Sequence, residues 1–474
     1  MSKSADEDQV KDRLQQLRCH FTWKLVIEDA EVTDLENRVF DEIDFLDTKY
    51  IVAMYNLLAY VKHLTGQNKE ALQSLQAAED LVQKEHARQS DVRRLVTWGN
   101  YAWLYYHMGR LAEAQIYLDK VENTCKQLGS PSCCTVESPE MDCEEGWALL
   151  KSGIKNYERA KACFEKALEV DPENPEFSAG YAIAVYRLDD FNKAPQTLHT
   201  LQQALRLNPE DAYMKALLAV TLQSIGREAE GEKYIEEALS SKSSQTYVLR
   251  YAGKFYRRKG SVDKAVQLLN AALRATPSSA FLHHQVGLCY KAQMIQIKKA
   301  NNWQVTGWDK EHVNKLVQMA MHEFETALKI RPIFHQACID LAEMLAELGH
   351  HGEAEDAFQK LLGMGVLDDD NLQQDLHFRY GRFQEFHRKS EVNAVIHYLK
   401  AINIDNSSFT GNNSLKALEK LVLRKLWRNA ADVESLSILG FVYKLNGEMN
   451  KALEYYEQAL RLAAGFENSV GHVP

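Results

Sequence analysis

The residues of this chain that could do chemistry are concentrated between Cys143 and Asp190. Within that stretch an indole, two cations, a phenol, a carboxylate and a branched apolar side chain recur at helical spacing: Trp147, Lys151, Tyr157, Glu176, Ile183 and Arg187. A repeat that only stacks on its neighbours needs small and apolar residues at its buried positions. It gives no packing reason to point an indole and two cations the same way, so the pattern predicts a ligand site.

A second group of cations follows on one helical face. Arg250, Lys254 and Arg257 stand at i, i+4 and i+7, which places them side by side on a helix. His284 and Gln285 follow in the next repeat. The whole chain has a net charge of −10, so a basic site must be local and enclosed. Cations that line a cleft attract a polyanion and concentrate their field there.

These residues lie in a repeat of about 34 residues that begins near Val52. Each copy has a first helix with small residues, a short turn that often holds Gly or Asn, and a second helix with regularly spaced Ala and aromatic or Leu residues. The clearest copy begins at Met141 and contains Ala148, Asn156, Tyr157, Ala160, Phe164, Ala167 and Pro172. About ten copies predict an all-α tetratricopeptide-repeat superhelix, whose first helices line the concave side.

Three interruptions of the repeat predict subdomains that can close on each other: 126–140, 293–315 and 405–433. We expect an N-terminal helical cap with helices over 9–23 and 35–50. The predicted parts are this cap (1–51), the first repeats (52–135), central repeats that hold the ligand site (136–290), extended helices with further repeats (291–405), and a C-terminal repeat with an association helix (406–474).

Several classes of function have no support in the sequence. The eight cysteines include no pair at the spacing of a zinc or redox motif, and they are expected to be free thiols. The adjacent pairs His283-His284 and His350-His351 point to different helix faces, so no metal site is expected. No catalytic constellation or phosphate-binding loop is present, and we predict neither an enzyme nor a cofactor. No signal peptide or membrane span is readable, so we expect a cytoplasmic protein without membrane association.

Other interpretations remain open at this point. Trp147 could pack between helices, Tyr157 could fill the turn of its repeat, and Arg187 could pair with an acid across the groove. The competing class of function is a scaffold that binds peptides, the usual role of these repeats. The carboxylate clamp of such scaffolds is absent because the first two repeats do not carry its residues. Scaffold binding remains compatible with the convex faces and the C-terminal repeat.

Four segments resemble the interferon-induced proteins with tetratricopeptide repeats. They are Leu17–Trp23, Phe45–Tyr50, Tyr105–Gln115 and Lys254–Gly260, and the resemblance covers essentially the whole chain. It implies a protein of innate immunity that captures the 5′ end of foreign RNA, either a 7-methylguanosine cap lacking 2′-O-methylation or a bare triphosphate, and so blocks translation. In that family single-stranded RNA enters a positively charged tunnel between subdomains, end first.

The resemblance also implies roles for individual residues. The positions that match cap-binding residues are Trp147 and Ile183, which would sandwich the base, with Glu176 at its polar edge and Leu46, Thr48 and Tyr213 nearby. The positions that match contacts to phosphates and first nucleotides are Arg38, Glu42, Lys151, Tyr157, Arg187, Arg250, Lys254, His284 and Gln285. A methylated guanine is cationic and stacks well on an indole, and arginines bind phosphate oxygens in bidentate fashion.

The same resemblance implies self-association, as a homodimer or with sibling proteins of the family. Tyr456 and Leu460 lie four residues apart on the last helix, and no repeat follows to cover them. Half-burial of this pair against its own partner helix is the alternative.

Two positions depart from the pattern of the cap-binding members. Glu42 stands in place of a glutamine and Asp211 in place of an asparagine, and the segment 190–201 is shorter. Each extra acid could oppose a triphosphate by about 1 kcal/mol if it is partly shielded from water. Alternatively, Glu42 could bias the site toward the cap.

Overall fold

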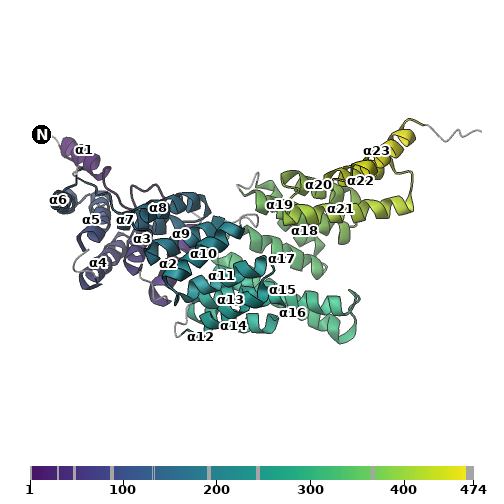
Figure 1. The fold of residues 1–474 in the computed structure, drawn as a ribbon, viewed down its shortest axis with the longest axis horizontal. Helices are drawn as coiled ribbons and strands as arrows, with labels where there is room; N and C mark the ends of the chain where they lie inside the picture. Colours follow the sequence, from purple (N-terminus) through teal and green to yellow (C-terminus); the bar gives the residue numbers. More distant parts are fainter. Residues whose placement is uncertain are drawn as a thin grey trace, which may run out of the picture. The chain divides into compact units, whose positions relative to one another are not determined.

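The chain is helical throughout the part that the structure describes. The computed structural model describes residues 3–28, 31–45, 50–85, 90–130, 132, 134–188, 194–241, 246–364 and 369–465, and none of these residues forms a strand. Consecutive helices pack as antiparallel pairs joined by short turns (Figure 1). The all-α repeat fold predicted from the sequence is therefore confirmed.

The chain forms two compact units, Met1–Gln296 with Thr326–Ile333, and Ile297–Glu325 with Phe334–Pro474. The first unit contains α1 (Lys3–Leu14), α2 (Val32–Phe45), α3 (Ile51–Leu64), α4 (Asn68–Glu85), α5 (Ser90–His107), α6 (Leu111–Gln127), α7 (Pro139–Lys151), the 3-10 turn η2 (Ile154–Asn156), α8 (Tyr157–Val170), α9 (Pro175–Leu188), α10 (Ala194–Leu207), α11 (Ala212–Ser224), α12 (Glu228–Ser240), α13 (Thr246–Lys259) and α14 (Val262–Ala275).

Two long helices, α15 (Ala280–Ala300) and α16 (Gly307–Ile330), have residues in both units. The second unit continues with α17 (His335–Glu347), α18 (His351–Gly363), α19 (Asp370–Phe386), α20 (Glu391–Ile404), α21 (Phe409–Arg428), α22 (Val433–Leu445) and α23 (Met449–Ala463). The five parts and their boundaries that the sequence suggested stay predictions.

Small residues let the helices of the central repeats approach closely. The ring of Phe164 on α8 is fully buried. A Cβ atom at Gly180 on α9 would lie 2.3 Å from this ring, and one at Gly146 on α7 would lie 2.9 Å from it. Any larger residue at these positions would overlap the ring, so the glycines set how α7 and α9 pack on α8. These two helices carry Trp147 and Glu176.

The N-terminal cap differs from the two helices expected over 9–23 and 35–50. Helix α1 ends at Leu14 and α2 begins at Val32, and residues 15–28 form a non-helical strap between them. The polar backbone groups of a strap have no helical partners and need side chains to satisfy them. Local periodicity does not predict such distant partners, so the helix expected over 9–23 was wrong beyond Leu14.

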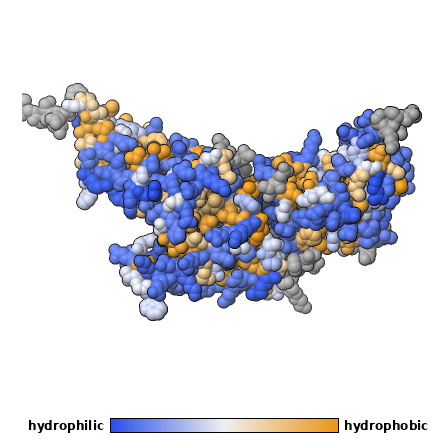
Figure 2. Space-filling view, turned by 180° about the vertical axis from the view of Figure 1, so that it is seen from behind, coloured by the Kyte–Doolittle hydropathy of each residue, from blue (hydrophilic) through white to orange (hydrophobic). Residues whose placement is uncertain are grey.

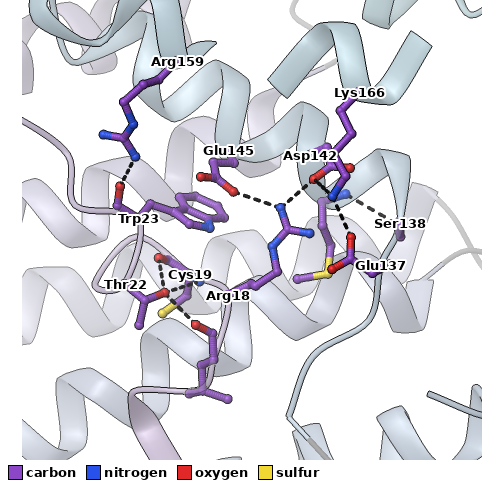
Figure 3. A network of polar contacts seen from close by, with 12 residues as sticks. Arg18, Cys19, Thr22, Trp23, Glu137, Ser138, Asp142, Glu145, Arg159 and Lys166 are labelled. Carbon is purple, nitrogen blue, oxygen red and sulfur yellow. Dashed lines mark hydrogen bonds and ion pairs between the residues drawn. The ribbon is translucent and has the colours of Figure 1, made fainter. Parts of the chain in front are cut away.

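Side chains of α7 and α8 bind this strap (Figure 3), and so does one side chain of η2. The guanidinium of Arg18 donates to Asp142 at 2.7 Å and to Glu145 at 2.9 Å. Arg159 donates to the carbonyl of Trp23 at 2.6 Å, and Asn156 bonds the backbone of the strap at Val26. The strap is thereby held on side chains of α7, η2 and α8, and α2 follows it in the chain.

The surface seen in Figure 2 is largely hydrophilic, with hydrophobic residues gathered in separate patches. This agrees with the 26% of charged residues in the sequence. No helix in the described part of the chain is long and apolar enough to cross a membrane.

Candidate functional site

Trp147 lies on α7 in the hydrophobic core of the first unit, and its side chain is only 3% exposed. The ring of Tyr50 lies against it with the centroids 4.2 Å apart and the planes inclined by 31°. The edge of Phe164 meets it at 5.3 Å. The indole Nε1 donates to no group among the described residues. Trp147 therefore combines a packed ring with a buried Nε1–H group that bonds no described residue.

A small pocket of about 30 Å³ borders the indole. Its lining residues are Tyr50, Val52, Ala53, Arg93, Glu140, Cys143, Glu144, Trp147, Glu176 and Phe177. This volume holds a water molecule or two but no purine base. A base would therefore need more room than this pocket offers.

Three carboxyl groups line this pocket, those of Glu140, Glu144 and Glu176. Glu176 lies in the first turn of α9, where a negative charge is favoured at the helix N-terminus. It accepts a hydrogen bond from the Sγ of Cys143 at 3.6 Å, and the guanidinium of Arg93 lies 3.9 Å away. Burial raises the pKa of Glu144 to about 7, while a hydrogen bond from Asn56 and the charge of Arg93 oppose this rise. Besides Glu140, the pocket thus holds one hydrogen-bond acceptor, Glu176, and one carboxyl group, Glu144, that carries a proton for part of the time near neutral pH.

Glu42 and Lys151 form a buried ion pair between α2 and α7. The hydroxyl of Tyr247 on α13 donates to the same Glu42 oxygen at 2.5 Å. Burial lowers the pKa of Lys151, and the Glu42 carboxylate opposes that effect. The residue that departs from the cap-binding pattern is therefore the counter-charge of a lysine predicted to bind phosphate.

Two arginines occupy the C-terminal end of α7. Arg187 donates to the carbonyl of Leu150 at 2.9 Å, and Arg38 donates to the carbonyl of Lys151 at 3.2 Å. The last carbonyls of a helix lack intrahelical partners and carry partial negative charge, so they favour cations. The Arg187 guanidinium also lies 5.5 Å from the ring centroid of Tyr157. The end of α7 thereby gathers three cations that lie far apart in the sequence.

A further group of cations lies along α13. The guanidinium of Arg250 lies 3.4 Å from the ring centroid of Phe281. Lys254 is one turn further on, and burial lowers its pKa to about 7, helped by the charges of Arg258, Arg250 and Arg257. A lysine held among three arginines and partly neutral at pH 7 indicates positive charge without enough compensating acid.

The residues around α13 contribute aromatic and polar groups. Tyr213 stacks on Tyr247 with the ring centroids 5.1 Å apart, and its buried hydroxyl bonds no group among the described residues. His284 and Gln285 are buried on α15, where the side-chain Oε1 of Gln285 accepts a hydrogen bond from Arg257 at 3.4 Å. Asp211, the second unexpected acid, is the N-cap of α11 and accepts from the amide of Met214 at 3.0 Å.

The structure brings most of the predicted residues together within the first unit. Trp147 and Glu176 share one pocket, and Ile183 is buried in the same core. Leu46 and Thr48 lie outside the described residues. The enclosure of the cations in a tunnel, and the role of each residue toward RNA, stay predictions.

The two residues of α23 that were predicted to mediate association differ in their exposure to solvent. Tyr456 is half-buried, because its ring lies where a Cβ atom at Gly440 would be. Leu460 is 69% exposed, and Leu453, which the sequence analysis missed, is 65% exposed. These leucines are seven residues apart, a spacing that could have revealed a shared face.

Sequence reasoning also missed Arg93, Tyr50, Glu144 and Tyr247. Tyr247 stands three residues before Arg250, so helical spacing could have found it. Glu144 stands three residues before Trp147 on α7, so the same spacing could have found it. Arg93 and Tyr50 reach the pocket from separate elements, and no local pattern indicates that they meet. No group of three metal-binding side chains occurs in the part of the chain described. The seven cysteines that can be described are free thiols.

Comparison with known proteins agrees with the repeat architecture. Models described as "Tetratricopeptide repeat" match residues 50–127, 150–219 and 433–466, and "Psidin, N-terminal TPR repeats region" matches 195–301. The human protein "Antiviral innate immune response effector IFIT1" is 64% identical over the full length of both chains. Human "Interferon-induced protein with tetratricopeptide repeats 2" is 42% identical over 96% of each chain.

Two solved structures of similar proteins contain RNA. A human IFIT1 dimer with m7Gppp-AAAA has a TM-score of 0.86 at 64% identity. A human IFIT1 dimer with PPP-AAAA has a TM-score of 0.83 at 61% identity. Each alignment covers 96% of this chain and 100% of the other.

Proposed function

Since this chain belongs to the interferon-induced proteins with tetratricopeptide repeats, we propose that it captures the 5′ end of non-self RNA and blocks translation of that RNA in the cytoplasm. The 5′ ends in question are a cap lacking 2′-O-methylation and a triphosphate. The similar human structures with m7Gppp-AAAA and PPP-AAAA support both ligands. This is a binding function, and it requires no cofactor.

The observation that carries the proposal is the gathering of partly or fully buried cations in the first unit, of which Arg38 pairs with Asp34 and Lys151 with Glu42. Arg187 and Arg38 meet Lys151 at the end of α7, and Arg250 and Lys254 lie along α13. Burying like charges is unfavourable without an anion to compensate them. A chain of phosphates supplies several negative charges at once and would relieve this cost. We assign the phosphates of the RNA end to these cations.

The base of a cap is assigned to the pocket beside Trp147. A 7-methylguanine carries positive charge, so it stacks favourably on an indole. Guanine offers its N1 and N2 hydrogens to an acceptor, and Glu176 supplies one at the pocket wall. Because the pocket is small, the groups that line it must move apart to admit the base. Cap binding therefore includes a local rearrangement, whereas binding of triphosphate RNA does not need one.

Self-association is assigned to the exposed side of α23. Leu453 and Leu460 present apolar surface on this last helix. A self-complementary patch of this kind suits a two-fold dimer or a sibling protein with a similar helix. The similar human protein forms a dimer in both structures.

The proposal is tested with one short RNA that carries four different 5′ ends: hydroxyl, triphosphate, cap, and cap with a 2′-O-methylated first nucleotide. The wild-type chain should bind the triphosphate and the unmethylated cap and reject the hydroxyl. Arg187→Ala should weaken both bound RNAs by about 1.5 to 3 kcal/mol, the value of a hydrogen bond to a charged group. Fluorescence anisotropy gives the affinities, and circular dichroism checks the fold.

Arg110→Ala is the matched control, because Arg110 pairs with Glu113 on an exposed turn of another repeat. It should leave all four affinities unchanged. If the wild type bound the hydroxyl RNA as tightly as the others, recognition of the 5′ end would be excluded. If folded Arg187→Ala kept full affinity, the phosphate site would not lie at the end of α7.

A further inference from the structure

One cation of the pocket beside Trp147 has no role in the account above. Among the described residues that line this pocket, Arg93 is the one that carries positive charge. It comes from α5, two helices before the α7 that carries Trp147. Its guanidinium is 3.9 Å from Glu176, which is beyond hydrogen-bonding distance. Arg93 is therefore near Glu176 without being fixed to it by a hydrogen bond.

The charges around Arg93 show that it acts on the pocket itself. Its charge lowers the pKa of Glu144, against the effect of burial, and it also lowers the pKa of the Cys143 thiol, which burial raises. Both groups line the pocket together with Glu176. The polar side chains that line the cavity thus include the guanidinium of Arg93 and three carboxyl groups, of which Glu176 is the one nearest to Arg93.

This combination matches the edge of one base. Guanine presents two donor groups, N1–H and N2–H₂, beside one acceptor, the O6 oxygen. A carboxylate can accept from both donors, and a neighbouring guanidinium can then donate to O6. Adenine presents one donor group and one acceptor, so it would leave a carboxylate oxygen without a partner in a shielded site.

We infer that Arg93 is a specificity-determining residue that donates to O6 of the cap guanine while Glu176 accepts from N1 and N2. This inference rests on the proposed function, because it places the cap base in the pocket beside Trp147. It predicts that Arg93 affects which base is accepted at the cap position. Arg93 should have no effect on a 5′-triphosphate, because that ligand brings no base into the pocket.

The test compares the full-length wild type with Arg93→Ala, Arg93→Lys and Glu176→Gln, and Arg110→Ala serves as the control on an exposed turn. Four versions of one RNA begin with Gppp, Ippp, Appp or triphosphate. Inosine lacks the N2 amino group but keeps O6, so it separates the two contacts.

Arg93→Ala should lower the affinity for Gppp and Ippp RNA by the same factor, on the order of tenfold. It should leave triphosphate RNA unchanged and reduce the preference for Gppp over Appp. Arg93→Lys should retain part of that preference, because an ammonium keeps the charge but loses the planar fork. Glu176→Gln should instead abolish the preference for Gppp over Ippp.

Three results would overturn the inference. An unchanged ratio of Gppp to Appp binding in Arg93→Ala would show that Arg93 does not read the base. Equal losses for capped and triphosphate RNA would mean that it only supports the fold. If the wild type bound triphosphate RNA but none of the capped RNAs, the assignment of the cap base to the pocket would be wrong, while the proposed binding of RNA 5′ ends would still hold. If no 5′ end bound better than a hydroxyl, the proposed function would fail, and the inference with it.

Discussion

Replacing Glu42 by glutamine should tighten the binding of triphosphate RNA. In the folded protein Glu42 is 4% exposed, forms an ion pair with Lys151 and accepts the hydroxyl of Tyr247. A phosphate that approaches Lys151 meets this carboxylate at the same time. Glutamine has almost the same shape and can still accept from Tyr247, but it carries no charge. The substitution therefore removes a repulsion and frees Lys151 from its counter-charge.

The size of the effect follows from Coulomb's law. A phosphate bound to Lys151 would lie roughly 5 Å from the Glu42 carboxylate, since both touch the same ammonium group. Two unit charges at that distance repel by about 3 kcal/mol at the effective dielectric constant of a protein site, and by about 1 kcal/mol in water. Relief of this repulsion corresponds to binding that is about 5-fold to about 150-fold tighter.

Stability should change in the opposite direction. Removing one partner of a buried ion pair leaves an uncompensated charge and commonly costs about 3 to 5 kcal/mol. The pKa of Lys151 is already lowered by burial, so without Glu42 the lysine can release its proton, which limits the loss. Glu42→Gln should therefore melt at a lower temperature in the absence of RNA and recover part of the difference when triphosphate RNA is added.

Fluorescence anisotropy with triphosphate RNA and a thermal melt measure the two effects. Glu113→Gln is the matched control, because Glu113 pairs with Arg110 on the surface and should change neither quantity. Binding by Glu42→Gln that is unchanged or weaker would refute the reasoning. It would show that Lys151 reaches the phosphate without leaving Glu42, or that the phosphates lie elsewhere.

Two further predictions concern the second group of cations and the last helix. Burial and three arginines lower the pKa of Lys254 to about 7, and a bound phosphate favours the charged form of this lysine. The affinity for capped RNA should therefore be full below pH 7 and fall as the pH rises through that value. The fall should be at most about tenfold per pH unit. Lys254→Arg should flatten this slope at constant ionic strength, and an equal slope in both proteins would exclude Lys254 as its source. Leu453→Glu with Leu460→Glu should convert a concentration-dependent dimer into a monomer that still binds RNA ends, as sedimentation equilibrium can show. Ile116→Glu, at an exposed site on α6, is the control, and a double variant that still dimerises would place the interface elsewhere.

The sequence by itself determined the features that repeat or that lie within one helix. Small and aromatic residues at a period of about 34 predicted the helix pairs, because each pair must bury the same kind of face against the next. The spacing of Arg250 and Lys254 placed both on one side of α13 for the same local reason. Trp147 and Lys151, four residues apart, are likewise one turn apart on α7.

The tertiary structure alone decided which distant side chains meet. Glu42 pairs with Lys151 although 109 positions separate them, and Arg93 enters the pocket of Trp147 from another repeat. Local periodicity predicts which face of a helix is buried, but it does not identify the residue of another element that will face it. Those partners depend on how whole helices pack, through close contacts such as Phe164 on Gly180. The local charge of the candidate site depends on these contacts, so the sequence alone could not predict it.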